Sequence, residues 1–255
     1  MEKWKLAAIA ALLLSFIGYG VFANSTANRT IGTDTITNNP SGAQPAIFTP
    51  PLPSKYDGKT FPAWPSITTW ANSSVPVKLG DSKGQLTLVE VFRIECSHCQ
   101  DAAPFLVRLH ARYAPRGVKF VGIQSPSDNP DPAFPENSWP EVQSWVKSKS
   151  YTWPVGFDPK RTWFKKSFGN NVSYPSLFLL DKNGVIIFFQ SGHDEAKGLQ
   201  LTAQLERLAP GNGDARARSI DLVEWIEGQL KSPVDAKTKQ QLEKDISSYL
   251  GSKIA

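Results

Sequence analysis

Apolar runs and helical periodicities alternate along the middle of the chain. Residues 86–92 (LTLVEVF) and 118–123 (VKFVGI) are largely apolar and β-branched, as in strands that are buried on both faces. Between them, apolar side chains recur at the spacing of one helix face: Ala103, Leu106, Leu109 and Tyr113. Pro115 and Gly117 then end this helix. A strand, a helix and a strand in this order predict a right-handed parallel crossover.

A second group of elements follows a Pro- and Asp-rich loop at 125–140. Residues 175–181 (PSLFLLD) and 185–190 (VIIFFQ) predict an antiparallel pair of strands, joined by a tight turn at Gly184. The remaining patterns predict helices at 140–149, 158–168 and 199–208 and a short strand at 151–157. We therefore expect an α/β domain with a mixed central sheet and flanking helices.

The N-terminus carries a different pattern. Charged residues at 2, 3 and 5 precede an uncharged apolar run at 6–23 (LAAIAALLLSFIGYGVFA). This order predicts a signal peptide or an uncleaved membrane anchor over residues 1–23. Either alternative predicts an exported protein on the periplasmic side of the cell envelope, where cysteines meet oxidising conditions.

Two polar segments flank the expected domain at 61–210. Residues 24–60 are rich in Asn, Thr, Ser, Gly and Pro, which predicts a flexible linker; the alternative is an arm packed on the domain through Ile47, Phe48 and Leu52. Residues 211–255 predict a helical C-terminal extension with helices at 219–230 and 233–250. Ser232 and Asp235 resemble a capping box for the second helix, with Pro233 at its first position. Its narrow apolar stripes fit either the main domain or a partner.

Charge and known motifs exclude several classes of function. The formal net charge is +5, from 28 basic and 23 acidic side chains, and the basic residues are scattered rather than clustered. This distribution indicates a solvated surface and no nucleic-acid partner. We find no Gly-rich phosphate loop and no Ser-His-Asp arrangement in the sequence.

The strongest chemical signal is the pair Cys96 and Cys99, the only cysteines of the chain. A zinc site needs four ligands, and beyond the pair the chain offers only three histidines, so we expect no metal. A purely structural disulfide across so small a loop adds little stability. Thiol–disulfide exchange remains, because it requires one exposed thiolate and a second thiol close enough to resolve the mixed disulfide. A Cys-x-x-Cys motif at the head of a helix supplies both.

The region 61–210 resembles the thioredoxin-like superfamily, and most of all its exported TlpA/ResA-type thiol–disulfide oxidoreductases. The matching stretches are LVEVFRIECSHCQDAAPFLVRLHARY, VKFVGIQSP and SYPSLFLLDKNGVIIFFQSG. The resemblance implies a three-layer α/β/α fold and a cis proline at Pro175 that faces the cysteine pair. Tyr174 and Pro175 would then shape a groove for an extended substrate segment.

The resemblance also implies Cys96 and Cys99 as catalytic residues, with their redox-active disulfide in place of any cofactor. The implied partners are protein thiols and disulfides and a membrane electron donor or acceptor. A reductive role like that in cytochrome c maturation follows from the same family.

The sequence departs from the family beside the pair. Glu95 replaces the usual Trp, His98 replaces a common Pro, and Ala102 replaces an acid found in many reductive members. We expect Glu95, Ser97 and His98 to tune the redox potential: a protonated His98 would favour the thiolate, and Glu95 would oppose it. Glu95 or Asp101 would replace the missing acid as proton acceptor for Cys99.

Three other functions share parts of this pattern. A peroxiredoxin would carry Thr where the chain has Arg93, so we do not expect one. An exported copper or haem chaperone would use Cys96, Cys99 and His193 as soft ligands. A redox-silent membrane-tethered adaptor would use the C-terminal helices to bind a partner.

Overall fold

The core of the protein is a six-stranded mixed sheet with the strand order β1-β4-β3-β2-β5-β6. The computed structural model describes residues 48–126, 138–169, 172–209, 214–228 and 234–252. Strands β2 (Thr87–Phe92) and β3 (Lys119–Gln124) are parallel, as the strand–helix–strand pattern predicts. Strand β4 (Val155–Phe157) continues the parallel part. Strands β5 (Ser176–Leu180), β6 (Ile186–Ser191) and β1 (Trp70–Ala71) pair antiparallel.

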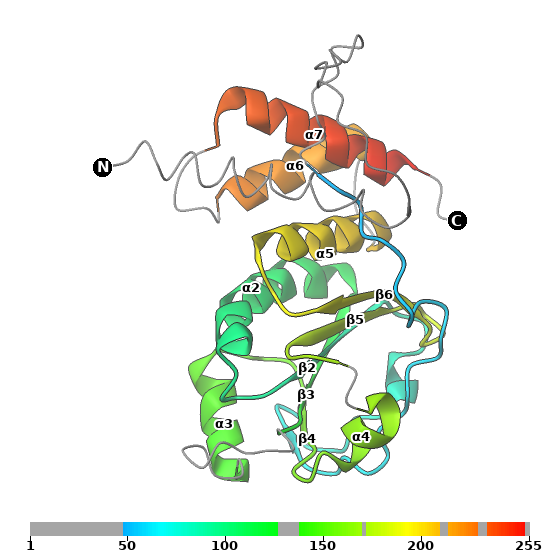
Figure 1. Cartoon of the computed structure of the whole chain (residues 1–255), viewed down its shortest axis with the longest axis vertical. Coiled ribbons are helices and arrows are strands. Elements are labelled where there is room, and N and C mark those ends of the chain that lie inside the picture. Colours follow the sequence, from blue (N-terminus) through cyan, green and yellow to red (C-terminus); the bar gives the residue numbers. More distant parts are fainter. Residues whose placement is uncertain (1–47, 127–137, 170–171, 210–213, 229–233, 253–255) are drawn as a thin grey trace, which may run out of the picture.

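Helices cover both faces of this sheet (Figure 1). One face carries α2 (Ser97–Tyr113), α3 (Trp139–Ser148) and α5 (Glu195–Leu208), whose buried side chains share one apolar cluster. The other face carries α4 (Thr162–Phe168) and the 3-10 turn η1 (Leu79–Ser82). A second 3-10 turn, η2 (Ala114–Arg116), ends α2 at Gly117, which has a φ of 84°. The predicted three-layer α/β/α fold is therefore confirmed.

Strand β2 supplies one side chain in turn to each face of the sheet, because successive residues of a strand point in opposite directions. Val89 and Val91 belong to the cluster under α4. Leu88 and Phe92 belong to the cluster under α2. Glu90 lies between these two and so points its carboxyl toward the α2 side of the sheet.

The predicted strand at 151–157 is wrong over its first half. The N–H of Tyr151 donates to the carbonyl of Val146 (3.0 Å), which closes the end of α3, and Ser150 adopts a left-handed φ of 59°. Pro154 has no N–H to give to a ladder. Strand pairing therefore starts only at Val155. The predicted helix at 158–168 likewise begins later, at Thr162.

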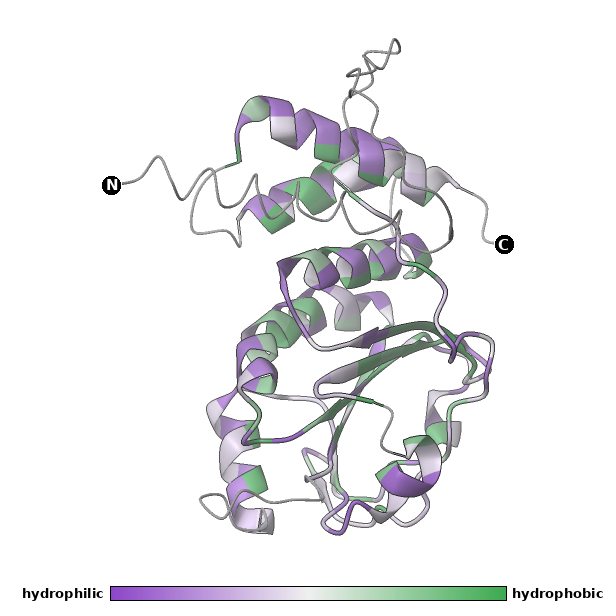
Figure 2. Ribbon diagram, in the orientation of Figure 1, coloured by the Kyte–Doolittle hydropathy of each residue, from purple (hydrophilic) through white to green (hydrophobic). Residues whose placement is uncertain are grey.

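The C-terminal extension forms two helices that pack on the main domain. Helices α6 (Ala215–Glu227) and α7 (Ala236–Gly251) cover the outer side of α5. Their apolar stripes face inward and their polar residues face out, as Figure 2 shows. Helix α7 begins later than predicted, because Asp235 itself is its N-cap and accepts from the N–H groups of Lys237 and Thr238. The predicted cap at Ser232 and Pro233 lies outside the described residues.

An arm packs against the C-terminal helices, in the range predicted as a flexible linker. Phe48 is 3% exposed and its ring lies 5.3 Å from that of Tyr249 of α7. Tyr56 packs under the sheet against Phe178 and Phe189. Leu52, in contrast, is 86% exposed. The alternative of a packed arm therefore holds for residues 48–60, with Phe48 rather than Leu52 as its anchor.

The remainder of the predicted linker and the apolar run at 6–23 lie outside the described residues. Within the described ranges, no helix has both the length and the apolar character that a membrane crossing requires.

Candidate active site

The two cysteines lie at the start of helix α2, where strand β2 delivers the chain to one edge of the sheet. Cys96 is the N-cap residue, with extended backbone angles, and Cys99 lies in the first turn. Cys96 is 7% exposed, whereas Cys99 is completely buried. Neither forms a disulfide in this structure. The pair therefore offers one sulfur to the surface and keeps the second behind it.

The surroundings of Cys96 favour its thiolate. A hydrogen bond from the Cys99 side chain is the main cause that lowers the pKa of Cys96 to about 6, against the opposing effect of burial. The backbone N–H groups of Cys99 and His98 and the charge of Arg93 act in the same direction. These are the donors that a helix N-terminus leaves free. Cys96 is therefore largely a thiolate at neutral pH.

Cys99 has the opposite character. Burial raises the pKa of Cys99, and its hydrogen bond to Cys96 raises it further. A thiol of this kind stays protonated and unreactive until a base takes its proton. The two sulfurs thus divide into an attacking thiolate and a held-back thiol.

The Tyr174–Pro175 peptide bond lies beside Cys96 and is cis, as the resemblance implies. The carbonyl oxygen of Tyr174 lies 3.7 Å from the sulfur of Cys96. The N–H of Gly192 donates to the carbonyl of Pro175 (2.7 Å), which fixes this loop against the end of β6. The ring of Tyr174 lies 5.3 Å from the guanidinium of Arg93, in a cation–π contact.

Glu95, Ser97 and His98, which we expect to tune the pair, surround Cys96. Ser97 and His98 are exposed, and His98 acts on the pKa of Cys96 through its backbone N–H. Glu95 approaches Arg93 at 3.9 Å, so its charge is partly compensated. The side-chain roles of these three residues stay predictions.

A buried acid that the sequence analysis missed lies under the pair. Glu90 is 3% exposed, and its carboxyl accepts a hydrogen bond from the hydroxyl of Tyr151 at 3.2 Å. Burial is the main cause that raises the pKa of Glu90 to about 8, and the charge of Cys96 adds to it. The charge of Glu90 in turn contributes to the raised pKa of Cys99. This coupling makes Glu90, rather than Glu95 or the exposed Asp101, the acid that senses Cys99.

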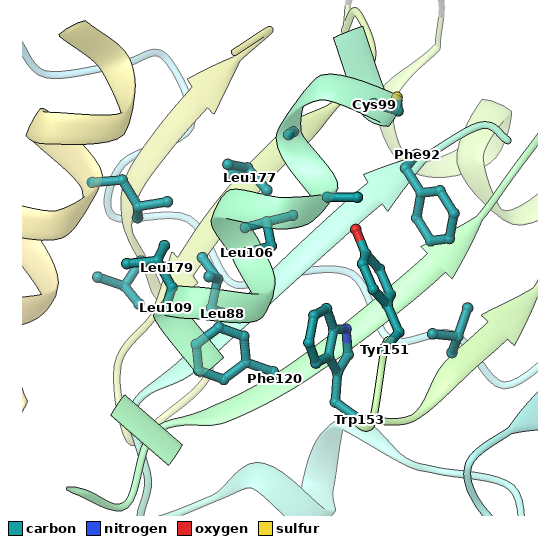
Figure 3. Packing of buried hydrophobic residues seen from close by; sticks show 14 of the residues in the cluster. Leu88, Phe92, Cys99, Leu106, Leu109, Phe120, Tyr151, Trp153, Leu177 and Leu179 are labelled. Atoms are coloured by element: carbon teal, nitrogen blue, oxygen red, sulfur yellow. The ribbon is translucent and has the colours of Figure 1, made fainter. Parts of the chain in front are cut away.

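A signal for Glu90 was present in the sequence. It is the only charged residue in the run 86–92, and its spacing from Leu88 and Phe92 puts it on a buried face. A buried carboxyl in a strand that leads directly to a cysteine pair is more informative than an acid on the following helix. Figure 3 shows Tyr151 on the same side of the sheet as Cys99, with its hydroxyl directed toward α2.

His193, the third ligand of the copper-chaperone alternative, stacks on Phe105 of α2 with ring centroids 4.9 Å apart. Among the residues that the structure describes, no three His, Cys, Asp or Glu side chains converge in a way that would hold a metal ion.

The chain belongs to the Redoxin family, which matches residues 57–205, more than half of its length. This match confirms the predicted thioredoxin-like class and, with the cysteine pair, the predicted thiol–disulfide oxidoreductase. No curated protein matches the chain in sequence.

Solved structures show the same fold. A hypothetical protein from Sinorhizobium meliloti 1021 is 21% identical with a TM-score of 0.50; the match covers 61% of this chain and 85% of that one. The thioredoxin domain of a thiol-disulfide oxidoreductase from Bacteroides vulgatus is 19% identical with a TM-score of 0.46, over 59% and 97% of the two chains. A thiol-disulfide isomerase from Corynebacterium glutamicum is 23% identical with a TM-score of 0.46, over 57% and 94%.

Proposed function

We propose that the protein is an exported oxidoreductase that reduces disulfides in protein substrates, with Cys96 as nucleophile and Cys99 as resolving thiol. The observation that carries this proposal is the division of labour within the pair: Cys96 has a pKa of about 6 at the head of α2, and Cys99 is a completely buried thiol behind it. Exchange chemistry needs these two properties together.

The reaction has two steps. The Cys96 thiolate attacks one sulfur of the substrate disulfide, forms a mixed disulfide and releases the other substrate sulfur as a thiolate. Cys99 then loses its proton and attacks the sulfur of Cys96, which forms the Cys96–Cys99 disulfide and releases the second substrate thiolate. Two electrons pass from the protein to the substrate, so a dithiol donor must reduce the pair again.

We assign to Glu90 the acceptance of the Cys99 proton. The carboxyl lies buried beside the pair, and the negative charge of Cys96 contributes to its raised pKa. Forming the mixed disulfide removes this charge, so Glu90 then ionises more readily. The base is therefore strengthened at the step that uses it.

The location and partners are part of the same proposal. The apolar run at 6–23 supports export and attachment to the envelope membrane. A membrane protein would then supply the electrons, and reduction of apocytochrome c is the substrate role that the TlpA/ResA resemblance suggests. The carbonyl of Tyr174 beside the sulfur of Cys96 supports binding of an extended substrate segment at this loop.

Two cysteine variants test the proposal. Cys96→Ser should abolish reduction of a disulfide-bonded protein substrate, while Cys99→Ser should accumulate a mixed disulfide that is visible by mass spectrometry. Ser97→Ala, between them, serves as the control and should retain turnover. Turnover by Cys96→Ser would refute the assignment. A reduction potential near about −270 mV would support a reductant, and one near about −120 mV would instead indicate a disulfide donor.

A further inference from the structure

The hydroxyl of Tyr151 makes a direct contact with the buried carboxyl of Glu90 that no other described residue duplicates. Tyr151 donates to Oε1 of Glu90 at 3.2 Å. Within the described part of the chain, the other oxygen, Oε2, has no hydrogen-bond partner. Holding one oxygen orients the carboxyl and leaves the second oxygen available to receive a proton.

The position of Tyr151 is fixed by its backbone on both sides. Its N–H donates to the carbonyl of Val146 at 3.0 Å. Its carbonyl accepts from the side-chain amide of Asn72 at 2.7 Å, and the same amide reaches the carbonyl of Trp153 at 3.0 Å. The segment is therefore held rigidly although it is not part of a strand.

Aromatic rings fix the side chain of Tyr151 as well (Figure 3). It is 3% exposed, and its ring centroid lies 4.0 Å from that of Trp153 and 5.2 Å from that of Trp145. Gly122 is the residue paired with Glu90 on β3, and a side chain there would lie 3.3 Å from Phe92. The absence of that side chain leaves room for the aromatic rings beside the carboxyl.

We propose that Tyr151 is a positioning residue of the exchange reaction, which holds the Glu90 carboxylate for proton transfer from Cys99 and so sets the pH range of the resolving step. This inference rests on the function proposed above. The hydroxyl remains a donor throughout, because burial and the charge of Glu90 raise the pKa of Tyr151. A donor that bonds the carboxylate favours its ionised form over the protonated one.

The other groups around Glu90 do not provide this control. The titratable groups that face it are Tyr151, from the segment before β4, and Cys96 and Cys99, from α2. Its partners across the sheet, Gly122 and Leu177, carry no charge. Of the three facing groups, Tyr151 alone opposes the raised pKa of Glu90.

The experiment follows one turnover of the reduced full chain with a limiting amount of 5,5′-dithiobis(2-nitrobenzoate). Attack by Cys96 releases one thionitrobenzoate, and attack by Cys99 on the mixed disulfide releases the second. The two absorbance phases therefore report the two thiols separately. Each phase is recorded between pH 5 and 10 for wild type, Tyr151→Phe and Glu90→Gln.

In Tyr151→Phe the midpoint of the second phase should move to higher pH by about one unit, because the carboxylate loses a hydrogen bond. The first phase should not move. Glu90→Gln should slow the second phase across the range, and adding Tyr151→Phe to it should cause no further shift. Glu90→Asp, which withdraws the carboxyl from the hydroxyl, should shift the second phase as Tyr151→Phe does, and it serves if that variant does not fold.

Tyr113→Phe is a matched control. Its hydroxyl also donates to a buried carboxyl, that of Glu206 at 2.9 Å, but at the far end of α2. Both phases of this variant should follow wild type. A second phase that is identical in wild type and Tyr151→Phe would overturn the role of Tyr151 and leave the proposed function standing. An unaffected Glu90→Gln would overturn it together with the Glu90 assignment. The absence of any second phase in wild type would instead refute the proposed function.

Discussion

The sulfur of Cys96 lies 3.7 Å from the carbonyl oxygen of Tyr174, and this contact joins two segments that are far apart in the sequence. A substrate strand that pairs with the Tyr174 loop would therefore carry its disulfide to the thiolate. The acidity of Cys96 determines how fast the first exchange step runs at a given pH.

We predict that Cys96 reacts with iodoacetamide with a half-maximal rate near pH 6, the value to which its neighbours lower its pKa. Cys99→Ala should move this midpoint to higher pH, because it removes the side-chain donor that contributes most to the shift. Arg93→Ala should move it less, and Arg93→Lys should leave it near wild type, because only the charge counts. A midpoint near 9.0 in wild type would contradict the prediction.

A second prediction concerns stability and follows from the raised pKa of Glu90. Its pKa is about 8 in the folded chain and 4.5 without the protein environment. Between these values the folded state holds a proton that the unfolded state has lost, so the contribution of Glu90 to stability falls as pH rises. Above pH 8 the full cost applies, on the order of a few kcal/mol for a shift of this size.

Glu90→Gln removes this cost, so its advantage in unfolding free energy over wild type should grow between pH 5 and 8. Urea titrations at several pH values measure this difference, and the titration of Cys96 cancels to first order because both proteins contain it. Parallel curves for the two proteins would show that the Glu90 carboxyl is not perturbed.

The sequence was sufficient for the fold and for the cysteine pair, because both depend on local patterns. The run 86–92 and the spacing of Cys96 and Cys99 predict a buried strand that leads into a reactive helix terminus. Tyr151 could not be found in this way, because it reaches Glu90 only through the pairing of β2, β3 and β4. It was assigned instead to a strand that the backbone does not form. Phe48 shows the same limit, since its partner Tyr249 lies near the other end of the chain.

A third prediction concerns the carboxyl that joins the C-terminal helices to α2. Glu206 of α5 is buried, and it accepts from Arg116 at 2.7 Å, Arg112 at 3.2 Å and Arg218 of α6 at 3.4 Å. Glu206→Ala leaves these cations without their buried partner, so we expect a loss of about 3–5 kcal/mol in unfolding free energy. Asp221→Ala is the control: its side chain is 68% exposed, and its pair with Arg112 should contribute less than about 1 kcal/mol. Equal losses in urea unfolding would contradict the prediction.

The last prediction concerns the close approach of β1 to β4 at the edge of the sheet. A methyl group on Gly156 would lie 2.7 Å from a side-chain carbon of Ile67 and 2.9 Å from the ring of Trp70. Gly156→Ala must therefore push β1 away from β4, and we expect it to cost about 1–3 kcal/mol. Gly80→Ala adds the same group where nothing lies within 4 Å, so it should change stability by no more than about 0.5 kcal/mol. Thermal unfolding of the two variants distinguishes them, and an unchanged melting temperature for Gly156→Ala would mean that β1 yields without cost.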